Sequence, residues 1–140
     1  MATFQRFEDI QAWQKARGVS LSIYKLSETG DFGKDFDLRR QIRRSALSIM
    51  ANIAEGQGRR SDRDFAHFLN IALGSLAETK SHLYMAFDLN YLSEDAFEEI
   101  YNKLDEVGRM TYAMIRHLRS DERDIPIYSR SSASQTSQTS

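Results

Sequence analysis

The sequence predicts an all-α protein whose residues 1–120 form an up-down antiparallel four-helix bundle. Four segments have apolar residues at steps of three and four, which is the spacing of one helix face. No segment shows the alternation of a β-strand, and the links between the four segments are short, as in antiparallel bundles. Residues 121–140 are rich in Ser, Thr and Gln, and we expect them to form a flexible tail.

The first two predicted helices span residues 7–28 and 36–55, with a break at the turn-forming residues 29–33. The inner face of the first consists of Ala12, Ala16, Val19, Ile23 and Leu26. That of the second consists of Leu38, Ile42, Ala46, Ile49 and Ile53. We expect Gly56 to end the second helix, because glycine adopts the left-handed conformation of a helix C-terminus at little cost.

The third and fourth predicted helices span residues 62–90 and 93–119. Ser61 and Ser93 are favourable N-cap residues, and Asp64 stands where a capping box has an acidic side chain. The inner face of the third helix consists of Phe65, Leu69, Ala72, Leu76, Leu83 and Phe87. That of the fourth consists of Phe97, Ile100, Leu104, Val107, Thr111, Met114 and Leu118.

The helices predicted over residues 36–55 and 62–90 are partly apolar or small on a second side. Leu47 and Met50 fall well away from the inner stripe of the first, and Ile71 and Gly74 fall away from that of the second. A helix that is apolar on more than one side is buried on more than one side. These four residues are therefore our candidate interface between copies of the chain.

The composition describes one domain and excludes several kinds of chemistry. Of 140 residues, 41% are hydrophobic and 28% are charged, which is ordinary for a globular domain. The absence of cysteine excludes disulfides, thiolate metal sites and cysteine nucleophiles. No apolar run suits a signal peptide or a membrane span, so we expect a cytoplasmic protein without a membrane partner. The formal net charge of −1 lacks the basic excess of dedicated nucleic-acid binders.

Basic residues gather around the helix predicted over residues 36–55, where they give residues 38–63 a local excess of +5. The cluster consists of Arg39, Arg40, Arg43, Arg44, Arg59, Arg60 and Arg63. A planar guanidinium suits phosphate oxygens, so one interpretation is RNA or DNA binding that does not depend on base sequence. The other is that these arginines pair with carboxylates of neighbouring helices or subunits, among Glu8, Asp9, Glu94, Asp95, Glu98 and Glu99.

Asn52, Glu55 and Gly56 form a second candidate motif at the end of the same helix. The helix dipole disfavours a carboxylate there, so we expect Glu55 to have a cationic partner such as Arg59 or Arg60, or backbone donors in the following loop. We expect Asn52 to hold that loop. A tuned general base is the catalytic alternative, but the sequence places no histidine or nucleophile nearby, and we favour a structural role.

Four-helix bundles often hold di-iron centres, so the sequence pattern of such a centre is relevant. Asp64 precedes His67 by three residues and Glu78 precedes His82 by four, but the last helix supplies only His117. The paired carboxylates of such centres are absent from the sequence pattern. We therefore expect no metal, no cofactor and no catalytic residues, and we predict that the protein is not an enzyme.

Three segments carry a resemblance to a known family. They are FEDIQAWQKA, QIRRSALSIMANIAEGQGRRS and DFAHFLNIALGSLAE. Over residues 4–118 the chain resembles the bacterial four-helix-bundle family named for proteins encoded by intervening sequences in large-subunit (23S) ribosomal RNA genes. The resemblance implies a left-handed bundle and a ring-like homopentamer. The family name brings no settled biochemical activity.

A related branch comprises the accessory proteins of diversity-generating retroelements, which bind a reverse transcriptase and nucleic acid through a basic surface. Those proteins are strongly basic, whereas this chain is not. It also has Gly33 and Met50 where the family often has proline or, at the second position, a small residue. These departures argue against the role of the retroelement accessory proteins. We expect an oligomeric binding or scaffold protein of unsettled role, and the leading hypothesis is weak, sequence-independent RNA or DNA binding through the arginines. The alternative is an adaptor whose partner is another protein.

Overall fold

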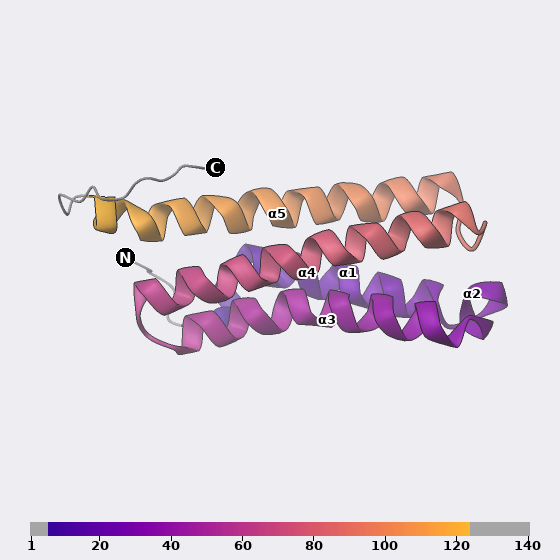
Figure 1. The fold of residues 1–140 in the computed structure, drawn as a ribbon, viewed down its shortest axis with the longest axis horizontal. Coiled ribbons are helices and arrows are strands. Elements are labelled where there is room, and N and C mark those ends of the chain that lie inside the picture. Colours follow the sequence, from indigo (N-terminus) through magenta and orange to yellow (C-terminus); the bar gives the residue numbers. More distant parts are fainter. Residues whose placement is uncertain (1–5, 124–140) are drawn as a thin grey trace.

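The computed structural model describes residues 6–123, and every regular element in that range is helical (Figure 1). The elements are η1 (Phe7–Asp9), α1 (Gln11–Leu26), α2 (Gly30–Lys34), α3 (Phe36–Gly58), α4 (Asp62–Asp88) and α5 (Glu94–Arg123). The four long helices run antiparallel to their neighbours in the chain, which confirms the predicted fold class. The tail predicted over residues 121–140 lies almost entirely outside the described residues.

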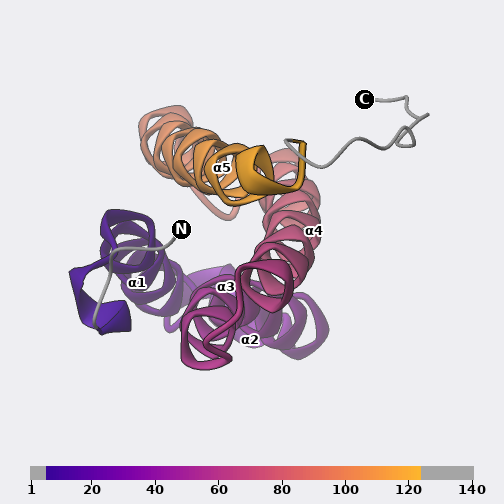
Figure 2. The same cartoon turned by 90° about the vertical axis from the view of Figure 1, so that its left-hand side faces the viewer.

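The four long helices surround one core (Figure 2). α1 packs against α3 and α5, and α4 packs against the same two helices on the other side. The predicted inner stripes fill the space between them, and the most deeply buried side chains include Val19, Ile42, Ile53, Leu69 and Leu104. The ends of α1 and α4 and the starts of α3 and α5 meet at one end of the bundle, to the right in Figure 1.

The first predicted helix, residues 7–28, is in fact divided. Ile10 adopts an extended conformation between η1 and α1, which places its side chain in the core. Phe7 then lies edge-on to Trp13, with ring centroids 4.9 Å apart. The turn expected over residues 29–33 contains the short helix α2, which begins at Gly30 with a φ of +67°.

The expectation that Gly56 ends the second predicted helix is wrong. α3 continues through Gly58, and Gly56 is buried within it. A Cβ atom on Gly56 would lie 2.9 Å from Phe65 Cδ1 and 2.9 Å from Phe68 Cβ, so the glycine is needed for the close approach of α4. The left-handed residue after the helix is Arg60, with a φ of +67°.

Short polar side chains join α3 to α4 along the middle of the bundle. Thr79 Oγ1 donates to Ser45 Oγ at 2.8 Å, and the hydroxyl oxygens of Ser48 and Ser75 lie 2.7 Å apart. Thr79 and Ser45 are buried, and a buried hydroxyl without a partner destabilises the fold. Because these side chains are small and mutually bonded, the two helix backbones can approach closely.

The start of α3 is fixed by the loop between α4 and α5. Asp35 caps α3 by accepting a hydrogen bond from the Leu38 backbone N–H at 3.1 Å. Its other carboxylate oxygen accepts from the Tyr91 hydroxyl at 2.8 Å, and the Tyr91 ring stacks on Phe32. The hydrogen bond to Asp35 raises the pKa of Tyr91 above its ordinary value.

Replacing Gly56 by alanine is expected to destabilise the bundle by about 1–3 kcal/mol, because an inserted methyl group in a packed interior forces the neighbours apart. Chemical denaturation followed by circular dichroism at 222 nm measures the change. Gly18→Ala is the matched control, since Gly18 is helical and nothing lies within 4 Å of its added Cβ. It should stabilise the protein by about 0.5–1 kcal/mol. Equal stabilisation by both changes would contradict the packing role of Gly56.

Candidate binding surface on α3

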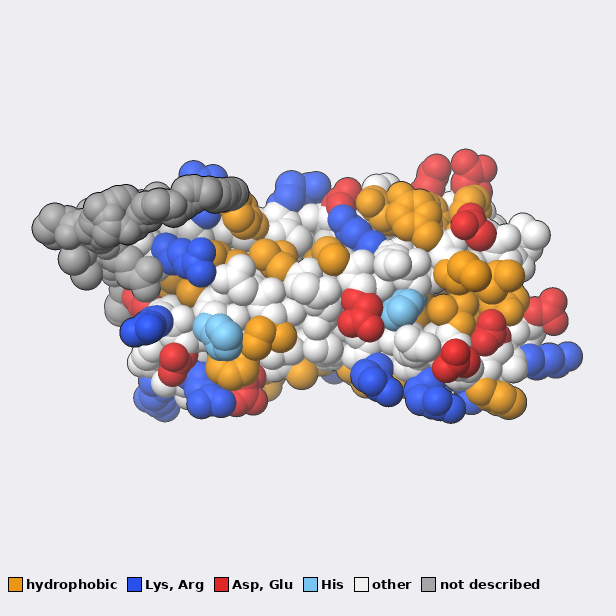
Figure 3. Space-filling model, viewed as in Figure 1, with side chains coloured by type: hydrophobic (Ala, Val, Ile, Leu, Met, Phe, Trp, Pro, Cys, Tyr) orange, Lys and Arg blue, Asp and Glu red, His pale blue; other side chains and the backbone are white. Residues whose placement is uncertain are grey.

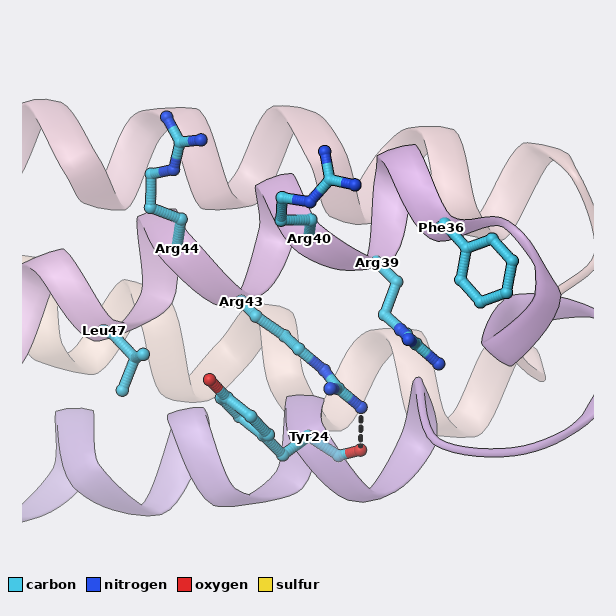
Figure 4. Close-up of a pocket in the computed structure, with 7 residues that line it drawn as sticks. All are labelled: Tyr24, Phe36, Arg39, Arg40, Arg43, Arg44 and Leu47. Carbon is cyan, nitrogen blue, oxygen red and sulfur yellow. Dashed lines mark hydrogen bonds between the residues drawn. The ribbon is translucent and has the colours of Figure 1, made fainter.

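The arginines at the start of α3 line a shallow pocket between α3 and α1 (Figure 4). Its volume is about 480 Å³. The lining residues come from the end of α1 and the first turns of α3, and they are Tyr24, Phe36, Arg39, Arg40, Arg43, Arg44 and Leu47. We call this surface the basic groove. It places four cations beside two aromatic rings and one aliphatic side chain.

Two of the four arginines hold the ends of neighbouring helices. Arg43 donates from Nη2 to the Tyr24 carbonyl at 3.1 Å and from Nε to Ser27 Oγ at 2.8 Å. Arg39 donates from Nη1 to the Gly33 carbonyl at 2.9 Å. These carbonyls lie in the last turns of α1 and α2, where the helix dipole is negative. Arg39 and Arg43 therefore have a structural role.

The same two guanidinium groups lie over aromatic rings. Arg43 is 4.3 Å from the ring centroid of Tyr24, and Arg39 is 4.9 Å from that of Phe36. Arginine stacks well on aromatic faces, and such cation–π contacts at exposed sites contribute about 0.5–1 kcal/mol each. The aromatic walls of the basic groove are thus held in place by the arginines that cap the helices.

Arg40 and Arg44 differ from this pair. Both are exposed, and neither has a hydrogen-bond or ion-pair partner among residues 6–123. They lie one turn apart on α3 and point away from α1, on the side opposite to Arg39 and Arg43 (Figure 4). Their charge remains available to a ligand or a partner.

The carboxylates that the sequence offered as partners do not pair with these arginines within the described chain. Glu8 lies 3.4 Å from Arg6, and Glu99 lies 3.4 Å from Lys103. Arg39 and Arg43 use backbone carbonyls and a hydroxyl group as acceptors instead. The interpretation of the cluster as a set of ion pairs within one chain is therefore wrong for these four arginines.

The remaining arginines lie at the other end of α3. Arg59 pairs with Glu55 at 3.0 Å and lies over the Phe68 ring, so the expected cationic partner of Glu55 is confirmed. Arg60 and Arg63 are exposed and have no partner in the part of the chain that the structure describes. Figure 3 shows Lys and Arg side chains in two groups along the α3 edge, with little positive charge between them.

Asn52 does not hold the loop after α3, and that expectation is wrong. Its Nδ2 donates to the Ser48 carbonyl at 2.8 Å and to Ser48 Oγ at 3.0 Å, both one turn earlier in the same helix. Ser48 in turn contacts Ser75 of α4. Asn52 therefore belongs to the polar contact between α3 and α4. Its short side chain reaches the Ser48 hydroxyl but not the loop.

The four candidate interface residues differ in exposure. Leu47 is 41% exposed and points toward α1 at one end of the basic groove, and Ile71 of α4 is 40% exposed. Gly74 is exposed, with nothing within 4 Å of an added Cβ. Met50 is half-buried and packs against the core, so it also supports the fold of the single chain.

The histidines do not form a metal centre in the described chain. His82 Nε2 lies 3.4 Å from Glu78 Oε2 on the surface of α4, and His67 lies edge-on to Phe68. Nowhere between residues 6 and 123 do three His, Asp or Glu side chains come within reach of one ion. Within the same range, no helix is long and apolar enough to cross a membrane.

Sequence reasoning missed an aromatic cluster on the seam between α4 and α5, in which Tyr84 is exposed. The Tyr84 ring lies 5.1 Å from Phe97 and 5.6 Å from Tyr101. Lys80 lies over the Tyr101 ring and pairs with Asp105, which orders the edge of the cluster. Phe97 belongs to the inner stripe as expected, but the side chain that covers it, Tyr84, falls outside every predicted stripe.

These features define a protein of the antiparallel four-helix-bundle class with a basic groove on its outer surface. The family model described as 23S rRNA-intervening sequence protein matches residues 8–113, and the chain belongs to that family. The resemblance seen in the sequence is thereby confirmed.

A solved structure from Bacteroides thetaiotaomicron has the same fold. It is described as a protein with unknown function from the S23 ribosomal protein family. The two chains are 29% identical and superpose with a TM-score of 0.70, over 76% of this chain and 96% of the other. No protein of curated function matches this chain.

The division of the arginines predicts different effects of two adjacent substitutions. Arg43→Ala should destabilise the bundle by about 1–2 kcal/mol, since it removes charged hydrogen bonds to the end of α1 from a partly exposed site. Arg44→Ala, the matched control, should change the stability of the single chain, measured at a protein concentration at which it is dissociated, by no more than about 0.5 kcal/mol. Urea denaturation of both variants measures the difference. Equal stabilities would show that Arg43 does not hold α1.

Proposed function

We propose that this protein acts without catalysis, as a self-associating binding scaffold, and that it assembles as the homopentamer that the family resemblance implies. The observation that carries the proposal is a set of large apolar side chains left exposed on all four long helices and their ends. In the described chain these are Leu21, Tyr24, Phe36, Leu47, Ile71, Tyr84, Met85, Leu89 and Tyr112. Three of them, Tyr24, Phe36 and Leu47, are grouped around the basic groove, and grouped exposed apolar side chains are typical of protein–protein contacts.

The chemistry of the basic groove supports a binding role rather than a catalytic one. Its lining residues, as the structure describes them, are arginines, aromatic residues and one leucine. Arginine stays protonated and cannot act as a general base, and the groove residues include no carboxylate or histidine. The groups present are suited to holding an anionic or aromatic surface.

Self-association predicts a wild-type mass several times that of one chain. Leu47→Glu and Ile71→Glu should each lower that mass if the altered side chain lies in a contact, because a buried unpaired charge opposes association. Both side chains are exposed in the single chain, so its fold should be preserved. Size-exclusion chromatography with light scattering measures the mass, and Ala113→Glu on the exposed surface of α5 serves as control. A monomeric wild-type protein would contradict the proposal.

A second candidate function is binding of RNA or DNA through the arginines that have no partner. Arg40, Arg44, Arg60 and Arg63 are free in the described chain, whereas Arg39, Arg43 and Arg59 are already bonded. Free arginines can neutralise phosphates and release counterions, and such binding is independent of base sequence. In an oligomer each free pair would recur once per copy and add to the total affinity.

Fluorescence anisotropy with a mixed-sequence single-stranded RNA at low salt tests this second function. Binding should weaken steeply as salt increases, and R60A/R63A should reduce the slope of log affinity against log salt by about 0.7 for each phosphate that is no longer neutralised. Arg6→Ala, which removes an exposed arginine outside the cluster, is the control. Absent or salt-insensitive binding would exclude the nucleic-acid role and favour the adaptor, whose capture of a protein partner should survive these changes.

A further inference from the structure

The bundle carries two outer surfaces of opposite charge. One is the basic groove on α1 and α3. The other lies on the seam between α4 and α5. We call it the acidic patch and define it by Tyr84 and Phe97 with the exposed side chains of Asp88, Glu94 and Glu98. Each surface contains aromatic side chains as well as charges, so the two match in both respects.

The acidic patch is placed by the aromatic contacts beneath it. Because Tyr84 of α4 contacts Phe97 of α5, the residues next to them on each helix also lie near the seam. Asp88 follows Tyr84 by one turn, and Glu98 follows Phe97 directly, with Glu94 one turn before it. Asp88, Glu94 and Glu98 are exposed, and none has a partner in the described part of the chain.

The two surfaces lie on opposite sides of the bundle but at the same end. The groove lies between α1 and α3, and the patch lies between α4 and α5, which are across the core from each other (Figure 2). The first turns of α3 and α5 are both at the right-hand end in Figure 1. At that end Figure 3 shows acidic side chains along the α5 edge, and further acidic side chains beside the basic ones near the α3 edge.

We propose that the basic groove of one copy of this chain receives the acidic patch of a second copy. Two bundles placed side by side with parallel axes bring these surfaces together without turning either bundle over. The contact is heterologous, because each copy contributes a different surface, and repeated contacts of this kind give a closed ring or a fibre. The proposal rests on the proposed self-association and names the surfaces that carry it.

A second copy of the chain in the basic groove explains why charges of both signs remain unpaired on one molecule. Arg40 and Arg44 point out of the groove without acceptors, and Asp88 and Glu98 lie exposed without donors in the described chain. No ion pair within the described chain joins these two sets of charges. Between two copies the guanidinium groups reach carboxylates while Tyr24, Phe36 and Leu47 cover the aromatic seam of the neighbour. Charge complementarity then fixes the register, and aromatic contact supplies buried area.

Charge reversal on each surface, alone and together, tests the proposal. R40E/R44E and D88R/E98R should each weaken self-association at least about tenfold, since like charges then face each other across the contact. The four changes combined in one chain should restore the wild-type mass, because the charges are complementary again. Light-scattering mass over a range of protein concentrations measures all three variants.

The substitutions are chosen so that each single chain still folds. The side chains involved are exposed and have no partner among the described residues, so their replacement removes no hydrogen bond or ion pair of the single chain. Thermal melts followed by circular dichroism check this. R60E/R63E makes the same change of charge at the other end of α3 and should leave the mass unaltered.

The outcomes separate this inference from the function on which it rests. An oligomeric wild-type protein whose mass is unchanged in R40E/R44E would overturn the assignment of the groove and leave self-association standing. A folded four-substitution chain that stays dissociated would also overturn it. Loss of RNA binding without loss of mass in R40E/R44E would assign the groove to a polyanion instead. A monomeric wild-type protein would remove both proposals.

Discussion

The close approach of α3 to α4 is the constraint on which the rest of the structure depends. The middle of α3 meets α4 through bonded hydroxyls, from Ser45 to Thr79 and from Ser48 to Ser75, and Gly56 admits the Phe65 ring at the far end. With one face of α3 fixed against α4 and another against α1, its arginine side chains have only the outer surface left. The basic groove is therefore a consequence of how α3 is packed.

The arginines show how one residue type serves two purposes within a few turns. Arg39 and Arg43 point toward α1 and bind carbonyls at helix ends, where a cation satisfies both the dipole and unpaired acceptors. Arg40 directly follows Arg39, and Arg44 directly follows Arg43, so each lies about 100° further around the helix. Neither has an acceptor in the described chain. A formal net charge of −1 thus coexists with a local excess of +5 over residues 38–63.

The fold followed from the sequence because helix periodicity is local. Ile42, Ile53 and Leu104 are predicted and found in the core, since a residue's neighbours three and four positions away decide its face. The role of Gly56 could not be predicted, because it depends on rings that α4 brings from the next helix. The arginine cluster could be predicted from the sequence. Which arginines are bonded and which are free could not, because the acceptors are backbone carbonyls, and the residue types do not show where these lie.

The angle between the two charged surfaces determines whether repeated heterologous contacts close. If the two contact surfaces of one copy lie on directly opposite sides, the copies stack in a straight line. A smaller angle between them, seen along the bundle axis, curves the row, and a ring of five copies closes when this angle is about 108°. Arg40 and Arg44 point away from α1, and thus toward the α4 side of the molecule, which reduces the angle to the α4–α5 seam below that of directly opposite sides. In the proposed contact, the one-residue offset that turns these two arginines away from α1 would therefore curve the row of copies.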